Sequence, residues 1–430
     1  MTALPPGPRR PAALQTVGWL ARHLPFLEGV RRDYGPTFTL RFTGVGRYVL
    51  VSDPESTKRL FSADRDHGLP EGRTRVLEPV LGPRSLLVLE GQEHMRRRRL
   101  MLPPFHGERM RTYEDTVIGA TVEEVESWPG GVGFPIRERT QAITLEVILR
   151  AVFGVAEGRR YEELREALSA MLEAARSIAH SLALLTRPAG SFGLYGRYQR
   201  LIDRVDSLLF AEIAERRGSR LDERDDVLSL LVGARFDDGS SMDDGELRDQ
   251  LMTLLVAGHE TTATALAWAF DMLLHNPETL ARASRAAREG DERYLVAVGD
   301  EAQRLRPVVP SVGRRIGSAG EYGGYEIPAG ESVLVATYLL HTNPDVYEDP
   351  YEFRPERFLD SRPQTYAWLP FGGGIHRCLG AAFAELELRV VLREVLARVE
   401  LRPAASRPER SVLGGVTLVP VGGTPVMVLG

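Results

Sequence analysis

Hydrophobic and polar positions alternate with two different periods along this chain. Residues 36–52 alternate apolar and polar side chains around a glycine-containing turn, which predicts a β-hairpin. From about residue 93 to residue 306, apolar residues recur at i, i+3, i+4 and i+7, which predicts helices. The clearest helical stretches are 113–128, 143–153, 161–180 and 198–218. Strand patterns return at 323–336 and 415–429, so we expect a mainly α fold with minor β-sheets, as a single domain over the chain.

Composition limits the classes of function. With 43% hydrophobic and 26% charged residues, the chain is globular and large enough to bury an extended core. The formal net charge of -5 gives no overall attraction to nucleic acid or to an anionic membrane, so any basic patch has to be local. The single cysteine excludes an internal disulfide, and the first 26 residues hold no apolar run long enough for a signal peptide or a membrane anchor. We expect a cytoplasmic protein, and its single lysine, Lys58, indicates a GC-rich bacterial genome.

The only cysteine, Cys378, lies in the sequence PFGGGIHRCLG, directly before a predicted helix. A lone cysteine is most often a small buried apolar residue, but the three glycines before it and Gly380 after it permit close approach to a large flat object. At the start of a helix, unpaired N–H groups favour thiolate over thiol. His376 is poorly placed to serve a nucleophilic thiolate as a base, and no second cysteine could share a zinc ion. A single thiolate ligand suits haem iron.

The arrangement Phe371-x-x-Gly374-x-His376-x-Cys378-x-Gly380 is similar to the haem-binding signature of the cytochrome P450 family. The resemblance extends over nearly the whole chain and implies a cytochrome P450 fold. By this likeness Cys378 would bind the iron of haem b. The residues of the loop that would contact the cofactor are Phe371, Gly372, His376, Cys378 and Gly380.

A second match is the sequence AGHETT, in a stretch otherwise apolar enough to be buried. Glu260 is unfavourable in such a helix unless it is used or paired. Ala257 and Thr261 share a helix face, so the threonine hydroxyl is expected to bond to the Ala257 carbonyl and to loosen the helix beside Gly258. By resemblance, Ala257 and Gly258 face the cofactor, and Glu260 and Thr261 are the family's acid–alcohol pair, which relays protons. His259 points to a different face and is expected to be structural.

Two further matches supply charged residues. Glu301 and Arg304, three apart on a predicted helix, resemble the family's buried ion pair, which Arg357 completes to brace the fold around the cysteine loop. The cationic groups that would hold the haem propionates are His94, Arg98, Arg314 and His376. The other three arginines between residues 96 and 99 are expected to form a solvated or anion-binding surface. Together with Arg377, they would offer an acidic electron carrier a basic docking face.

By resemblance, the protein is a monooxygenase that hydroxylates or epoxidises an apolar small molecule, in bacterial secondary metabolism. It would use O2 and two electrons from a separate ferredoxin and ferredoxin reductase. The segments expected to line the substrate pocket are mostly aliphatic, namely 69–89, 175–196, Leu254, 256–261 and 308–312. Two alternatives stay open: a peroxygenase, desaturase or coupling enzyme of the same family, and a non-catalytic haem sensor or carrier.

Overall fold

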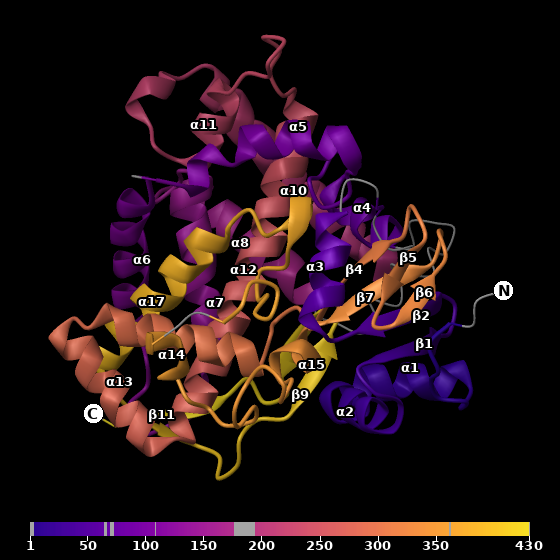
Figure 1. Ribbon diagram of the computed structural model, residues 1–430. Helices are drawn as coiled ribbons and strands as arrows, with labels where there is room; N and C mark the ends of the chain where they lie inside the picture. Colours follow the sequence, from indigo (N-terminus) through magenta and orange to yellow (C-terminus); the bar gives the residue numbers. More distant parts are fainter. Residues whose placement is uncertain are drawn as a thin grey trace.

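Helices make up most of the computed structural model, and its largest sheet lies to one side, on the right in Figure 1. The structure describes residues 4–63, 67–68, 73–107, 109–175, 194–360 and 363–429. Three helices are adjacent to this sheet, both along the chain and in the structure. They are α1 (Ala12–Ala21), α2 (His23–Tyr34) and α3 (Pro54–Ser62). The mainly α fold with minor sheets predicted from the two periods is confirmed.

Most of the larger helical part lies at the centre and left of Figure 1. Its helices are α4 (Arg73–Leu81), α5 (Gly91–Met101), α6 (Arg109–Val125), α7 (Ile136–Val147), α8 (Arg159–Ala175), α10 (Leu194–Arg217), α11 (Val227–Gly233), α12 (Asp244–Leu274), α13 (Pro277–Glu289), α14 (Glu292–Leu305) and α17 (Ala381–Arg398). Two short helices, α15 (Thr337–His341) and α16 (Arg357–Asp360), lie between the sheet and α17 in the chain. The four periodic stretches fall mainly on α6, α7, α8 and α10. The one at 143–153 continues from α7 into a π-helical turn, Ile148–Val152, and the one at 161–180 runs beyond the described end of α8.

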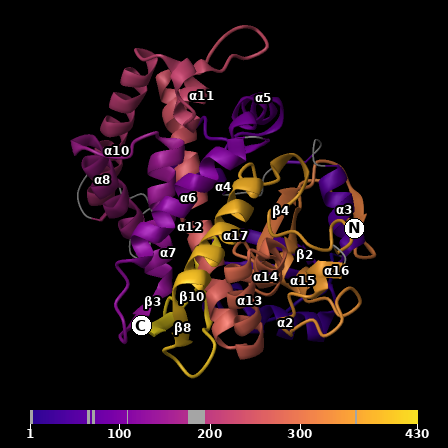
Figure 2. The same ribbon diagram turned by 90° about the vertical axis from the view of Figure 1, so that its left-hand side faces the viewer.

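The 31-residue helix α12 is central to the fold. It packs against α7, α10, α14 and α17, and Figure 2 shows α17 alongside it. Its N-terminus is capped by Asp243, whose Oδ1 accepts a hydrogen bond from the N–H of Glu246 at 2.8 Å. Residues 262–274 are buried and mostly apolar on every side, which is typical of a helix enclosed by other elements.

The largest sheet combines strands from both ends of the chain. Its order is β1 (Thr37–Phe42), β2 (Gly46–Val51), β7 (Ser332–Ala336) and β4 (Ser311–Arg315). β1 and β2 pair antiparallel, with Thr37 opposite Val51, which confirms the predicted hairpin. β7 then pairs parallel to β2 and antiparallel to β4.

The remaining strands form small sheets. They are β9 (Ser411–Gly414) with β10 (Thr417–Pro420), β5 (Gly320–Tyr322) with β6 (Tyr325–Ile327), and β11 (Pro425–Leu429) between β3 (Gly133–Pro135) and β8 (Glu400–Pro403). β3 falls inside the stretch predicted to be helical. With three residues it is too short to show a period of two, and it exists because it pairs with the C-terminal strand.

Alternate residues of the large sheet enter two different clusters of buried side chains. Tyr48 and Leu50 pack towards α2, whereas Val49 and Val51 pack towards α3. The second cluster also contains Phe61 of α3 and Leu369, which directly precedes the glycine-rich cysteine loop. One face of the sheet thereby supports that loop.

Candidate active site

Three consecutive glycines shape the loop in front of the cysteine. Gly372 and Gly374 have φ angles of +66° and +68°, a region of backbone that favours glycine. Gly373 is required for a different reason, since a Cβ there would lie 2.8 Å from the ring of Phe61 on α3. The conformation of the loop therefore requires glycine at 372 and 374 for the backbone torsion and at 373 for the close approach to α3.

Cys378 lies where this loop turns towards α17. Its N–H donates to the carbonyl oxygen of Phe371 at 2.9 Å. The side chain is exposed, yet burial raises the pKa of the thiol, and a hydrogen bond from the N–H of Gly380 opposes that rise only in part. The two observations agree if the sulfur faces a space enclosed by the protein. The expected stabilisation of thiolate by nearby N–H groups is present but burial outweighs it, so a bound metal cation would favour the thiolate further.

Two histidines meet beside the cysteine loop. The ring centroids of His94, on α5, and His376 lie 4.1 Å apart. His94 is buried, with Nδ1 3.0 Å from the carbonyl oxygen of Leu86 and Nε2 3.1 Å from that of Ile375. These contacts join α5 to the loop and bring together two of the four predicted propionate ligands.

The other two predicted ligands approach the same loop. Arg314 of β4 is buried, and its Nη2 lies 3.3 Å from the carbonyl oxygen of Gly373. Its neighbour Arg315 is exposed, so Arg314 is the arginine directed at the loop. Burial lowers the pKa of Arg98, and the charge of Cys378 favours its protonated form. Among the described residues, no carboxylate contributes to the pKa of Arg98, which leaves a cation available to an anionic group.

The hydrogen bond expected within α12 is present. Thr261 Oγ1 donates to the carbonyl oxygen of Ala257 at 2.5 Å. Leu254, Ala257, Gly258 and Thr261 are partly exposed, although most of the helix around them is buried. They lie at i, i+3, i+4 and i+7 and so share one face. Halfway along its length, α12 therefore presents one partly accessible face.

Glu260 is held by two residues of α7 that no pattern in the sequence indicated. It forms an ion pair with Arg137 and accepts a hydrogen bond from Gln141 Nε2 at 2.7 Å. The expectation that this carboxylate is used or paired therefore holds, and its partners are now named. His259 is buried, with Nε2 3.0 Å from the carbonyl oxygen of Gln141, which agrees with a structural role.

A buried carboxyl lies next to this segment and was not expected. Glu387 of α17 is 3% exposed and hydrogen-bonds to Thr262 of α12. Burial raises its pKa to about 8, so it is protonated at neutral pH. A signal for it exists in the sequence: Glu387 falls on a helical stripe whose other members, Phe383, Val390 and Val391, are apolar.

The predicted cluster of buried ion pairs is present. Glu301 Oε2 lies 2.7 Å from Arg304 Nε, and neither side chain is exposed. Arg357 Nε lies 3.0 Å from Glu301 Oε1. The remaining donors of Arg304 reach the carbonyl oxygens of His341, Pro350 and Glu352. The guanidinium of Arg304 thus joins α14 to the segment that leads towards the cysteine loop.

His341 continues this connection and was not singled out in the sequence. Its Nε2 accepts a hydrogen bond from the N–H of Leu369 at 2.7 Å. Burial lowers its pKa to about 3, so the imidazole is neutral and able to accept that bond. The buried cluster therefore reaches the residue in front of Pro370, where the cysteine loop begins.

The arginines of α5 differ from the expected free basic surface. Arg97 is buried, with Nε 2.8 Å from Glu246 Oε1. Arg96 Nη2 lies 2.6 Å from Asp238 Oδ2, and Arg99 Nη1 lies 3.7 Å from an oxygen of the adjacent aspartate. The prediction is wrong for Arg97 and incomplete for the other two. Acids far away in the sequence fold back onto the helix, and local composition cannot show this.

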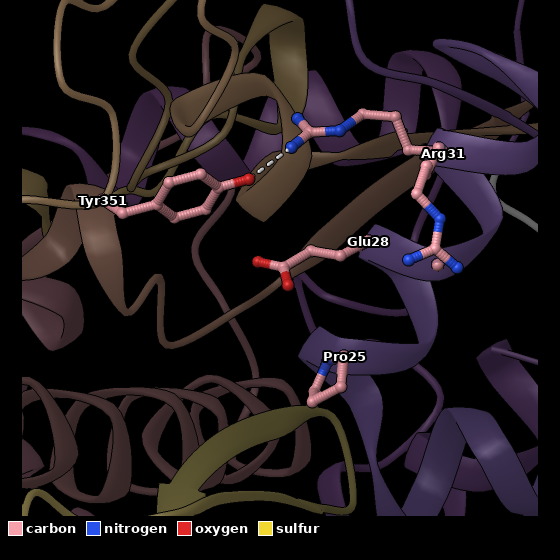
Figure 3. Close-up of a pocket in the computed structure, with 6 residues that line it drawn as sticks. Pro25, Glu28, Arg31 and Tyr351 are labelled. Atoms are coloured by element: carbon pink, nitrogen blue, oxygen red, sulfur yellow. Dashed lines mark hydrogen bonds between the residues drawn. The ribbon is translucent and has the colours of Figure 1, made fainter.

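A polar cleft of about 380 Å³ lies elsewhere, between α2 and the segment before α16 (Figure 3). Arg31 donates to Tyr351 Oη at 2.8 Å across it, and Glu28 bonds to Tyr338. Arg31 also bonds to two backbone carbonyls. The charged groups that line the cleft therefore hold α2 in place. The cleft contains neither the cysteine nor the accessible face of α12.

Comparison with known proteins agrees with the geometry of the cysteine loop. A family model described as Cytochrome P450 matches residues 5–424. The chain belongs to the cytochrome P450 family. Cytochrome P450 135B1 of Mycobacterium tuberculosis is 42% identical over 99% of this chain and 91% of its own length. Cytochrome P450 137 of the same organism is 38% identical over 96% of this chain and 87% of its own length.

A solved P450 structure shows the same fold. The retinoic acid-bound cyanobacterial CYP120A1 matches 100% of this chain and 99% of its own with a TM-score of 0.85, at 24% sequence identity. This P450 is accordingly a monooxygenase that depends on haem iron and O2 and receives electrons from a redox partner. Within the described ranges, no helix is long and apolar enough to cross a membrane.

Two of the predicted pocket-lining segments fall largely or partly outside the described residues. The segment 175–196 is described only at its ends, and 69–89 only from residue 73 onwards. The other predicted lining positions are described. Leu254, Val256, Val309 and Val312 are partly exposed, although their neighbours are mostly buried.

Proposed function

We propose that this P450 hydroxylates or epoxidises an apolar small molecule in bacterial secondary metabolism, with haem b as cofactor and a ferredoxin and its reductase as electron source. The observation that carries the proposal is the environment of Cys378. Its side chain is exposed at the end of the glycine-rich loop, and burial disfavours a negative charge on the sulfur unless a positive group such as a metal ion binds it.

The residues around this sulfur fit a haem. Gly380 has a φ of -90°, which any residue adopts, and a Cβ there would meet no described atom within 4 Å. Neither backbone nor protein packing thus requires glycine at this position, whereas a flat group beside the sulfur would. The groups that could contact two propionates are His94, Arg98, Arg314 and His376. Because Cys378 is the only cysteine, no thioether links could attach the porphyrin, which favours haem b.

When bound, thiolate-ligated haem iron supplies oxygen activation and the transfer of one oxygen atom. We assign proton delivery to Glu260 and Thr261. The Thr261 hydroxyl already donates to Ala257, so its oxygen lone pairs are left to orient a water or a proton donor on the accessible face of α12. Glu260 is partly exposed and anchored to α7 by Arg137, a position from which it can take up protons from solvent.

The substrate would contact α12 and the start of β4. Leu254, Val256 and Val312 are aliphatic and partly exposed, which favours an apolar guest over a charged one. Terpenoids, fatty acyl chains, steroids and macrolides all meet this description. Polar groups near the guest come from Thr261 and the helix backbone.

The electron carrier would dock on the side of the cysteine loop. Arg377 is exposed directly beside Cys378. Arg96 and Arg99 are also accessible, but each is already paired with an aspartate. Such surface pairs are weak, so an acidic ferredoxin could exchange its own carboxylates for them.

Two experiments test the proposal. The reduced CO complex of the wild type should show the red-shifted Soret band of thiolate ligation, and Cys378→Ser should abolish it. A spectrum like that of a histidine-ligated globin would refute the proposal. Compounds of the four classes should then be screened for a low-spin to high-spin shift, and hits turned over with ferredoxin and reductase. Full turnover with NADPH alone would contradict the separate carrier, and peroxide-driven turnover without reductant would favour the peroxygenase alternative.

A further inference from the structure

The helix α1 has an inverted distribution of polar and apolar side chains. Its buried residue is polar: Gln15 is 1% exposed, and its Nε2 donates to the carbonyl oxygens of Pro8 and Arg10 at 3.0 and 2.8 Å. Its Oε1 accepts the N–H of Arg41 of β1 at 3.0 Å. These polar contacts attach α1 to the sheet together with Trp19, whose ring lies 5.0 Å from that of Phe42 on β1. The remaining large apolar side chains of α1 do not face the sheet.

The outward face of α1 is apolar. Leu14, Val17 and Leu20 are 58%, 60% and 48% exposed, and we call these three residues the α1 face. At 100° per residue they span one side of the helix, with Ala13 and Ala21 exposed between and beside them. Figure 1 shows α1 at the lower right margin of the molecule, beside α2.

The neighbouring hairpin extends this apolar surface. Val45, in the turn between β1 and β2, is 51% exposed. The turn lies against α1, because the N–H of Thr43 donates to Thr16 Oγ1 at 3.0 Å. Several large apolar side chains therefore lie together and accessible, which is uncommon on a protein that meets only water.

Positive charge surrounds the α1 face. Arg9 and Arg10 precede the helix, Arg22 follows it, and Arg41 lies beside it; all four are exposed. The first acidic residue of the chain is Glu28, so the sequence up to that point carries only cations, in a protein whose net charge is -5. The local charge is therefore opposite to that of the whole molecule.

We propose that the α1 face binds the surface of an anionic phospholipid bilayer, with α1 lying in the plane of the interface. An exposed apolar helix face with arginines at both ends is the pattern of an interfacial helix. With ten residues, α1 is far too short to span the bilayer. A second copy of the chain fits less well, because a two-fold contact through this face would set the same arginines against each other.

Vesicle flotation tests the proposal with the haem-loaded protein. Wild type should float with vesicles of phosphatidylglycerol and phosphatidylcholine, and much less with phosphatidylcholine alone, and added salt should weaken the binding. The triple variant Leu14→Ser, Val17→Ser, Leu20→Ser should bind more weakly by about tenfold or more. A matched control, Val132→Ser with Phe210→Ser, removes exposed apolar side chains elsewhere and should bind like the wild type.

Fold is checked independently, since all substituted side chains are exposed: the CO spectrum and the thermal midpoint of each variant should match the wild type. The proposal is overturned if wild type does not float, if it binds neutral vesicles equally well, or if the triple variant binds as tightly. It is also overturned if sedimentation shows a wild-type dimer that the triple variant dissociates, because a second copy would then cover the face.

Discussion

Replacing Glu387 by glutamine should change how the stability of this P450 depends on pH. The carboxyl is almost fully buried between α12 and α17, and Thr262 is its hydrogen-bond partner. One hydroxyl does not replace the hydration that a carboxylate loses, so the folded protein holds the neutral acid and its pKa is raised to about 8. The unfolded chain ionises at an ordinary carboxyl pKa, about 4.3.

The direction in which stability changes with pH follows from how many protons the folded and unfolded states bind. Below the unfolded pKa both states are protonated, and Glu387 makes no pH-dependent contribution. Between that value and about pH 8 only the unfolded state loses the proton, so stability falls by about 1.4 kcal/mol for each pH unit. The amide introduced by Glu387→Gln cannot titrate and still offers Thr262 a carbonyl oxygen. From pH 6 to pH 8 the variant should therefore gain roughly 2–3 kcal/mol relative to the wild type.

Thermal unfolding of the haem-loaded proteins measures this difference. For a chain of this length, the gain corresponds to a relative rise in midpoint of about 3 °C between the two pH values. The control Glu289→Gln, at an exposed position on α13, should show the same change of midpoint with pH as the wild type. If Glu387→Gln also shows the pH dependence of the wild type, the Glu387 carboxyl has the same pKa in the folded and unfolded protein. Its assignment as a buried neutral acid is then wrong.

Three further substitutions test the site. Thr261→Ala should keep substrate binding and NAD(P)H oxidation but lower the product formed per NAD(P)H, with peroxide released instead. The reason is that one positioned proton donor raises the rate of its proton-transfer step by about 10²–10⁴-fold. The control Thr264→Ala, at a fully buried hydroxyl on the same helix, should form as much product per NAD(P)H as the wild type. Equal coupling in both variants would remove Thr261 from the relay. Arg357→Met removes the second ion-pair partner of the buried Glu301 carboxylate and should destabilise the protein by about 3 kcal/mol, measured as a lower thermal midpoint. An unchanged midpoint would show that the ion pair with Arg357 does not stabilise the fold. Asp238→Asn should lower the KM for an acidic ferredoxin by about two- to fivefold at low salt and have no effect at high salt; a raised KM would mean that this aspartate helps docking.

Local features of the site were predictable from the sequence because their causes are local. The glycines at 372 and 374 satisfy backbone torsions of their own loop, and the bond from Thr261 to Ala257 spans one helical turn. Helix and strand periods likewise report which face of an element is buried. These effects need no knowledge of distant parts of the chain.

Features that depend on distant partners could not be predicted. Arg137 meets Glu260 only because α7 packs against α12, and the aspartates that pair with the arginines of α5 lie in a loop before α12. The helix α1 was not predicted from the sequence, and in it Gln15 is the buried residue and leucines face outwards. The direction of a helix face is set by what the helix packs against. For Gln15 the partners are two backbone carbonyls of the N-terminal segment and one N–H of β1.

The single thiol has a practical consequence for experiments on this P450. Once Cys378 is bound to iron, a cysteine introduced at any exposed position would be the one thiol free to react with a maleimide. A fluorophore or spin label could then be attached at one chosen site, without the removal of native cysteines that such labelling usually requires. A label at position 17 would report directly on the polarity around α1.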